Sequence, residues 1–202
     1  MAEVHSTTQR QKRSTLSWHL GASSVDQAVR FSSGPMSVVL SGTDGLRVGR
    51  QLRAANHTTD LRVDPLGYET KPPREEGVLF RLEADWAKMQ RDAGVTELLS
   101  PGVYVPEGDP GLLAAALAGQ EEWAANAGGA TLQIAIHWRW LVDDCGALIA
   151  ALDDTDSRVA LLLADSNDPL SKAGAVEGLA SVVAAHPNIA LHRCDLGGLG
   201  AV

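Results

Sequence analysis

The chain has 202 residues, of which 45% are hydrophobic and 21% are charged, and its formal net charge is −8. This composition is ordinary for a soluble globular protein, and the length suits one large domain. The negative charge repels nucleic-acid phosphates, and no apolar run approaches the roughly 18 residues that span a membrane, so we predict neither nucleic-acid nor membrane binding.

Targeting features and cysteine usage both favour a cytoplasmic protein. Residues 1–14 contain basic side chains with no apolar segment after them, so they do not form a signal peptide, and we predict a disordered tail. Cys145 and Cys194 lie far apart and match no CxxC pattern, which favours a reduced chain. The remaining residues, 15–202, are predicted to form a single domain.

The first part of the chain starts an alternation of strands and helices. A weak strand at 15–22 precedes a short helix at 25–31. A β-branched strand at 36–42 ends in glycine and leads into a helix at 43–56. The strand at 60–68 is interrupted by a proline, which lacks the N–H group that a strand ladder needs.

The middle of the chain contains the clearest helix. A shorter helix at 83–94 ends at a glycine, and a strand at 96–106 is broken near a proline. The helix at 109–129 then has Asp109 as its N-cap and Pro110 at its first position, with alanine and leucine in its interior.

The last part of the chain continues the same alternation. A strand at 131–138 is followed by a helix at 141–155 with apolar residues at helical spacing. The strand predicted at 159–165 begins with six consecutive apolar residues and ends at Asp165, and such an apolar run is expected for a strand that is buried on both faces. A helix at 169–187 and a final strand at 189–195 complete the pattern.

Seven strands separated mostly by helices predict an α/β fold with parallel crossovers. Two architectures fit this pattern: a TIM-barrel-like (β/α)8 fold and, as the alternative, an open doubly wound parallel sheet. The regular spacing of the units and the polar residues at strand ends favour the barrel. On this interpretation the chain is truncated after strand 7, and its open strand edge is predicted to be completed by another chain or by a homo-oligomer.

The fifth strand illustrates how the two faces of the sheet are predicted to differ. Ile134 and Ile136 share one face, whereas Gln133, Ala135 and His137 share the other. We expect the apolar face to contact the surrounding helices and the polar face to line the barrel interior or crevice.

Sites in parallel α/β folds gather at the carboxyl ends of the strands. Carboxylates and imidazole exchange protons, so the predicted catalytic residues are those at these ends: Asp64, His137, Asp165 and Asp195. Metal binding by Asp64, His137, Asp165 and His192 is the alternative, but no HxH, HExxH or CxxC spacing supports it, and no metal is predicted. The nearby Asp168 is predicted to cap a helix.

Three further features suggest ligand binding, each with a structural alternative. Arg62 and Arg193 each precede an aspartate by two residues and are predicted to bind substrate, unless each Arg/Asp pair is a structural salt bridge. Trp138 is predicted to stack on a substrate or to pack beneath a loop. The glycines of the last loop are predicted to cradle a phosphate or to form a tight turn, and they are Gly197, Gly198 and Gly200.

These residues together predict an enzyme that acts on a small anionic or polar substrate. The alternative is a non-catalytic or truncated barrel fragment that needs a partner or a missing C-terminal part. No sequence feature identifies the reaction, the substrate or a cofactor.

Overall fold

The computed structural model describes residues 17–20, 26, 29, 37–66, 85–164 and 168–192. All seven predicted strands are present, which confirms the α/β class, and they are β1 Ser17–Leu20, β2 Ser37–Ser41, β3 Leu61–Asp64, β4 Val103–Val105, β5 Leu132–His137, β6 Val159–Ala164 and β7 Ala190–His192. The helices between them are α2 Gly42–Ala54, α3 Trp86–Asp92, α4 Pro110–Asn126, α5 Arg139–Val142, α6 Cys145–Asp153 and α7 Ala175–Ala185. The predicted tail, 1–14, lies outside the described residues.

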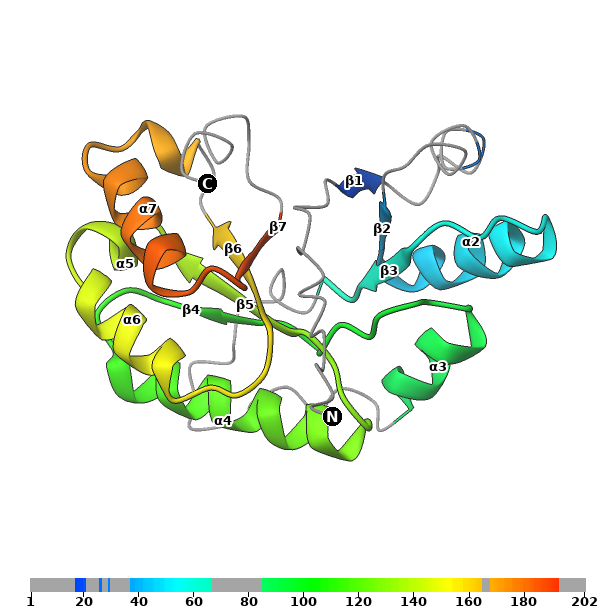
Figure 1. Cartoon of the computed structure of the whole chain (residues 1–202), viewed down its shortest axis with the longest axis horizontal. Helices are drawn as coiled ribbons and strands as arrows, with labels where there is room; N and C mark the ends of the chain where they lie inside the picture. The colour runs from blue at the N-terminus through cyan, green and yellow to red at the C-terminus, as the bar shows by residue number, and fades with distance from the viewer. Residues whose placement is uncertain are drawn as a thin grey trace, which may run out of the picture.

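The strands form two parallel sheets whose order follows the sequence. The first sheet has the order β1-β2-β3 and the second has the order β4-β5-β6-β7. Figure 1 shows the two sheets side by side, each with helices on its outer side. A doubly wound sheet requires a point at which the strand order reverses, and neither described sheet has one.

The segment that precedes β4 forms hydrogen bonds with both sheets. The N–H of Thr96 donates to the carbonyl of Leu61 in β3 at 2.8 Å, and the hydroxyl of Thr96 accepts from the N–H of Leu61 at 2.9 Å. A few residues later, Ser100 donates to the carbonyl of Thr131, and Thr131 donates to the carbonyl of Leu98, both at 2.9 Å. The backbone therefore links β3 to the start of β5.

The two faces of the second sheet differ as predicted. Ile134 and Ile136 are buried in the apolar cluster formed with the helices, which confirms the prediction for that face. Gln133 and Ala135 are equally buried but belong to neither apolar cluster, in agreement with their position on the opposite face. The side-chain amide of Gln133 has no hydrogen-bond partner among the described residues, although it is fully buried.

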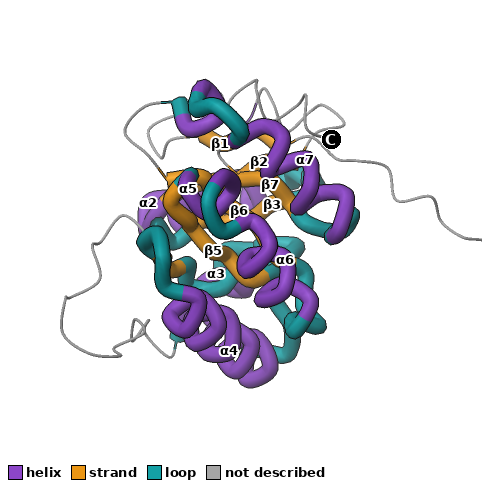
Figure 2. Tube along the Cα trace, turned by 90° about the vertical axis from the view of Figure 1, so that its left-hand side faces the viewer, coloured by secondary structure: helices purple, strands orange, loops and turns teal. Residues whose placement is uncertain are grey.

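Each sheet packs against its own helices to form a separate apolar cluster. One cluster joins β2 and β3 to α2 and α3, and the other joins β4–β7 to α4, α6 and α7. Figure 2 shows α4, α6 and α7 in front of the second sheet. Trp123 on α4 packs against both clusters, so this helix connects the two cores.

Two predicted helices are each divided in the structure, so the prediction of a single continuous helix is wrong in both places. Asp143 and Asp144 lie between the end of α5 and the start of α6, and this break splits the helix expected at 141–155. The helix expected at 169–187 begins as a short 3-10 helix, and Gly174, with φ of +82°, precedes α7. Such a left-handed conformation is open to glycine at little steric cost and lets the chain change direction.

Both predicted aspartate caps are present. The N–H of Leu112 donates to Asp109 Oδ1 at 2.9 Å, and Pro110 occupies the first position of α4. Asp168 Oδ1 accepts from the N–H of Leu170 at 3.0 Å, but it caps the 3-10 helix at Pro169–Ser171 rather than α7.

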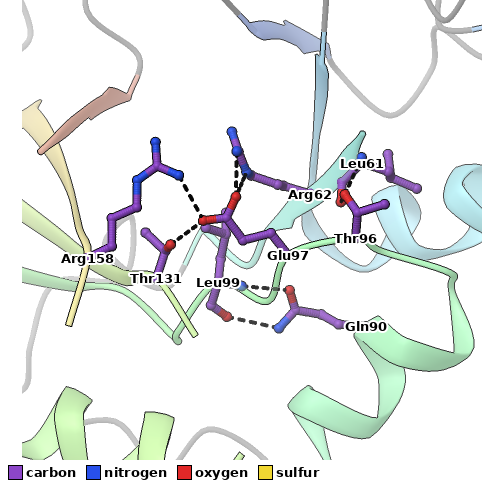
Figure 3. Close-up of polar contacts among 8 residues, drawn as sticks. All are labelled: Leu61, Arg62, Gln90, Thr96, Glu97, Leu99, Thr131 and Arg158. Atoms are coloured by element: carbon purple, nitrogen blue, oxygen red, sulfur yellow. Dashed lines mark hydrogen bonds and ion pairs between the residues drawn. The ribbon is translucent and has the colours of Figure 1, made fainter. Parts of the chain in front are cut away.

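The buried side chain of Gln90 on α3 forms two hydrogen bonds with the backbone of Leu99, as a neighbouring strand would. Its Nε2 donates to the carbonyl of Leu99 at 2.9 Å, and the N–H of Leu99 donates to its Oε1 at 3.0 Å (Figure 3). Replacing Gln90 by leucine is expected to lower the free energy of unfolding by about 2 kcal/mol, because the buried N–H of Leu99 loses its partner. The carbonyl of Leu99 also loses Gln90 but keeps the indole Nε1 of Trp86, which donates to it at 3.3 Å. Urea unfolding measures this change.

The matched control for Gln90 is Gln120 on α4. Gln120 is also buried, but its Oε1 has no hydrogen-bond partner among the described residues. Gln120→Leu therefore removes a polar atom that has no partner among the described residues. It is expected to lower the free energy of unfolding by less than about 0.5 kcal/mol. Equal destabilisation by the two substitutions would contradict the role assigned to Gln90.

Candidate functional site

Polar side chains from β4 and β5 meet at the carboxyl edge of the second sheet. Glu107 lies two residues beyond β4, and His137 is the last residue of β5. Glu107 Oε2 lies 3.4 Å from His137 Nδ1 and 3.1 Å from Arg139 Nη1. Parallel pairing in register brings the two strand ends together, since Val105 pairs with Ile136. The carboxylate therefore faces both an imidazole and a guanidinium group.

His137 Nδ1 has a partner in either neutral form of the ring. The backbone N–H of Arg139 lies 3.3 Å from Nδ1 and can donate to it when the proton is on Nε2. When Nδ1 carries the proton, it can donate a hydrogen bond to the Glu107 carboxylate. No described contact involves Nε2, and the side chain is 26% exposed. The ring can therefore give or accept a proton at Nε2.

Two cations flank the half-buried indole of Trp138. The guanidinium carbon of Arg139 lies 5.6 Å from the ring centroid, and Lys172 Nζ lies 5.7 Å from it. The ring of His137 is also close to Trp138, with the two centroids 5.6 Å apart. Lys172 lies between the 3-10 helix and α7, and it forms no ion pair within the described part of the chain. An uncompensated positive charge beside an aromatic ring suits an anionic ligand.

We call these five residues the carboxyl-edge cluster: Glu107, His137, Trp138, Arg139 and Lys172. The sequence prediction had included His137 and Trp138 but not Glu107 or Lys172. Glu107 could have been found, because it follows a strand almost as directly as the predicted aspartates do. The position of Lys172 depends on the turn after the 3-10 helix, which has no signal in the apolar pattern.

Asp64 ends β3, and its side chain is fully buried. Its Oδ1 accepts from the backbone N–H of Leu66 at 2.9 Å, which is the geometry of an Asx turn. This contact gives Asp64 a structural role at the end of the strand. Its predicted catalytic role stays a prediction.

The opposite end of the sheets carries a second polar group, which we call the amino-end cluster: Arg62, Glu97, Thr131 and Arg158. Arg62 Nε and Nη2 lie 2.6 Å and 2.5 Å from Glu97 Oε2 (Figure 3). Thr131 donates its hydroxyl hydrogen to Glu97 Oε1, and Arg158 Nη1 lies 3.3 Å from the same oxygen. These residues come from β3, from the segment before β4, and from positions just before β5 and β6.

The protonation of Glu97 follows from these contacts. Burial alone would raise its pKa, but the hydrogen bond from Thr131 and the positive charges of Arg62 and Arg158 outweigh burial and lower the pKa. Glu97 is therefore ionised, and its ion pairs with Arg62 and Arg158 join the first sheet to the second. We call this set of contacts the Glu97 clamp. The guanidinium of Arg62 is engaged by this clamp, whereas active sites gather at the carboxyl ends of the strands, and its substrate-binding role stays a prediction.

Several predicted site residues lie outside the described residues, and they are Asp165, Arg193, Asp195, Gly197, Gly198 and Gly200. Within the described ranges, no group of three or more His, Cys, Asp or Glu side chains is arranged to hold a metal ion. Cys145 is half-buried, and burial raises the pKa of its thiol, which disfavours the reactive thiolate.

No helix in the described ranges combines the length and apolarity needed to cross a membrane. No protein-family model matches this sequence, and no curated protein matches it significantly.

Proposed function

We propose that the chain is a (β/α)-barrel enzyme that moves a proton to or from a small anionic substrate at the carboxyl-edge cluster. The observation that carries the proposal is the pairing of His137 with Glu107 beside a tryptophan flanked by two cations. General acid–base groups, an anion-binding charge and an aromatic surface are the components that such a reaction needs.

Three observations support the barrel architecture. The described strands are parallel and follow the order of the sequence. The helices of the second sheet pack on one face, while Gln133 and Ala135 occupy the other. The segment before β4 continues the hydrogen bonding from β3 to β5. In such barrels the carboxyl ends of the strands carry the active site, which is where the cluster lies.

Each member of the cluster has a distinct proposed role. Nε2 of His137 exchanges the proton with the substrate, and Glu107 orients the ring and stabilises its charged form. Lys172 binds the anionic group of the substrate, since no described carboxylate neutralises it. Trp138 provides a flat surface for the substrate. In the sequence Asp165 and Asp195 follow β6 and β7, and they remain proposed proton-transfer partners.

The experiment that tests this proposal is hydrogen exchange into substrate in deuterium oxide. A panel of 2-oxo acids, 2-hydroxy acids and sugar phosphates is incubated with the protein, and loss of carbon-bound hydrogen is followed by proton NMR. His137→Gln is expected to slow the exchange by at least about 100-fold, which is the usual contribution of a general acid–base group.

Two further variants make the result specific. Lys172→Met is expected to raise the substrate concentration for half-maximal exchange about tenfold, because it removes one charge-assisted contact. His57→Gln, after the end of α2, is the control and is expected to exchange at the wild-type rate. Absence of any exchange that depends on His137 across the panel would refute catalysis and leave a non-catalytic binding domain.

A further inference from the structure

A cavity of about 370 Å³ lies at the amino end of the second sheet, between the connections that lead into β6 and β7. This volume is within the range of small-molecule sites in proteins. The carboxyl-edge cluster lies at the other end of the sheet, and none of its residues lines the cavity. Its lining includes an apolar set, Leu152, Val159 and Ile189, and a polar set, Asp156, Arg158 and His186.

Arg158 has hydrogen-bonding capacity beyond its contact with Glu97. Its Nη1 lies 3.3 Å from Glu97 Oε1, whereas Nε and Nη2 have no hydrogen bond or ion pair within the described residues. The side chain is 44% exposed, so solvent and solutes can reach it. A guanidinium group presents two parallel donors that match a carboxylate. Arg158 can therefore bind a carboxylate while it stays attached to Glu97.

His186 offers an acceptor in the same cavity. Its Nε2 lies 3.2 Å from the carbonyl of Ile149 and 3.5 Å from Asp153 Oδ1, and both neighbours are acceptors. These contacts place the proton on Nε2, which leaves Nδ1 of the neutral ring as an acceptor. The described contacts of His186 do not use Nδ1.

Asp156 supplies a negative charge two residues before Arg158. Its backbone N–H donates to Glu121 Oε1 at 3.0 Å, but its carboxylate forms no ion pair within the described part of the chain. The cavity thus combines one guanidinium, one carboxylate and one imidazole acceptor with an apolar wall. A simple anion such as phosphate would be repelled by Asp156, whereas a ligand with both charges satisfies both side chains.

We infer that this cavity binds a free α-amino acid with an aliphatic side chain. The carboxylate of the ligand pairs with Arg158, and its ammonium group donates to Asp156 and to Nδ1 of His186. Its side chain packs on Leu152, Val159 and Ile189. This site is separate from the proposed proton-transfer site and does not depend on it.

The test uses three probes that differ by one charged group. They are L-leucine, 4-methylpentanoate, which lacks the ammonium group, and isopentylamine, which lacks the carboxylate. Each is titrated into the ¹⁵N-labelled full chain while backbone amide shifts are recorded. L-leucine is expected to shift the amides of 155–159 and those of 185, 186, 188 and 189, since Pro187 has no amide hydrogen. It is expected to bind at least about tenfold more tightly than either analogue, since each analogue loses a charge-assisted contact.

Variants of the lining residues test which side chain contacts which group of the ligand. Arg158→Gln is expected to weaken L-leucine binding at least about tenfold. Asp156→Asn is expected to weaken L-leucine binding but to strengthen the binding of 4-methylpentanoate, whose negative charge Asp156 repels. Because Arg158 also contacts Glu97, a second variant, Ala185→Phe, obstructs the cavity from α7 and leaves that contact intact; it is expected to abolish binding. Arg47→Gln, on α2, is the control and is expected to bind like the wild type.

Two results would overturn the inference. One is the absence of shifts in 155–159 and 185–189 at about 20 mM L-leucine, a concentration above the millimolar range of weak metabolite sites. The other is equal affinity for L-leucine and its two analogues, which would mean that the charged residues do not select the ligand. His137→Gln is expected to leave leucine binding unchanged, so failure here is distinguishable from failure of the proposed enzyme activity.

Discussion

Gly178→Ala is expected to lower the free energy of unfolding by about 3 kcal/mol or more, among the largest effects of a single methyl group in this protein. A Cβ atom at Gly178 would lie 2.0 Å from the carbonyl oxygen of Leu141 and 2.7 Å from its carbonyl carbon. Both atoms belong to the backbone, so a change of rotamer cannot relieve the overlap. The new methyl group would have to push α7 away from α5.

The matched control for Gly178 is another helical glycine. Gly146 lies in α6, and a Cβ atom there would have no neighbour within 4 Å. Gly146→Ala is expected to be neutral or to stabilise the fold by about 0.5–1 kcal/mol, because alanine loses less backbone entropy in a helix. Urea unfolding of both variants measures the difference. Similar free energies of unfolding for the two variants would mean that α5 and α7 move apart at no energetic cost, which would contradict this prediction.

The second large effect is expected for Glu97→Gln, which should lower the free energy of unfolding by about 2–3 kcal/mol. The substitution removes the negative charge that faces the guanidinium of Arg62, whose side chain is 11% exposed. Breaking a fully buried ion pair costs about 3–5 kcal/mol, and the partial exposure of Glu97 reduces that figure. Asp44→Asn, in an exposed pair on α2, is the control and is expected to cost less than about 1 kcal/mol.

The contribution of Glu97 is also expected to depend on pH. Its pKa is lower in the folded chain than in the unfolded chain, so the folded state favours the ionised form. The stabilisation is therefore complete above the unfolded pKa, at about 4.3, and it is lost as the pH falls through the lower folded value. Urea unfolding from pH 7 to pH 3 should show a smaller loss of stability for Glu97→Gln than for the wild type. Parallel pH profiles would contradict this linkage.

The strands could be predicted because burial leaves a local pattern in the sequence. All six residues of the run at 159–164 are apolar, and they form β6. The alternation around Ile134 assigns both faces of β5 correctly. The helix breaks could not be predicted in the same way. Apolar spacing continues from Leu141 to Leu148 across the break between α5 and α6, so periodicity alone gives one helix where the backbone forms two.

The site could be predicted only in part, for a related reason. His137 and Trp138 sit at a strand end, and the rule that ligands bind at carboxyl ends found both. The partners of Glu97 could not be predicted, because Arg62 lies 35 residues before it and Arg158 lies 61 residues after it. Contacts over such separations depend on how the strands are placed in space.

The sequential strand order has a consequence for how the chain acquires its structure. Among the described strands, every hydrogen-bonded neighbour is also the next strand along the chain. Each of these pairings closes a single crossover, and that closure costs less entropy than pairing strands that lie further apart in the chain. Strands can therefore be added one after another as the chain leaves the ribosome. The half built on β2 and β3 can form its core before the Glu97 clamp joins it to the half that is synthesised later.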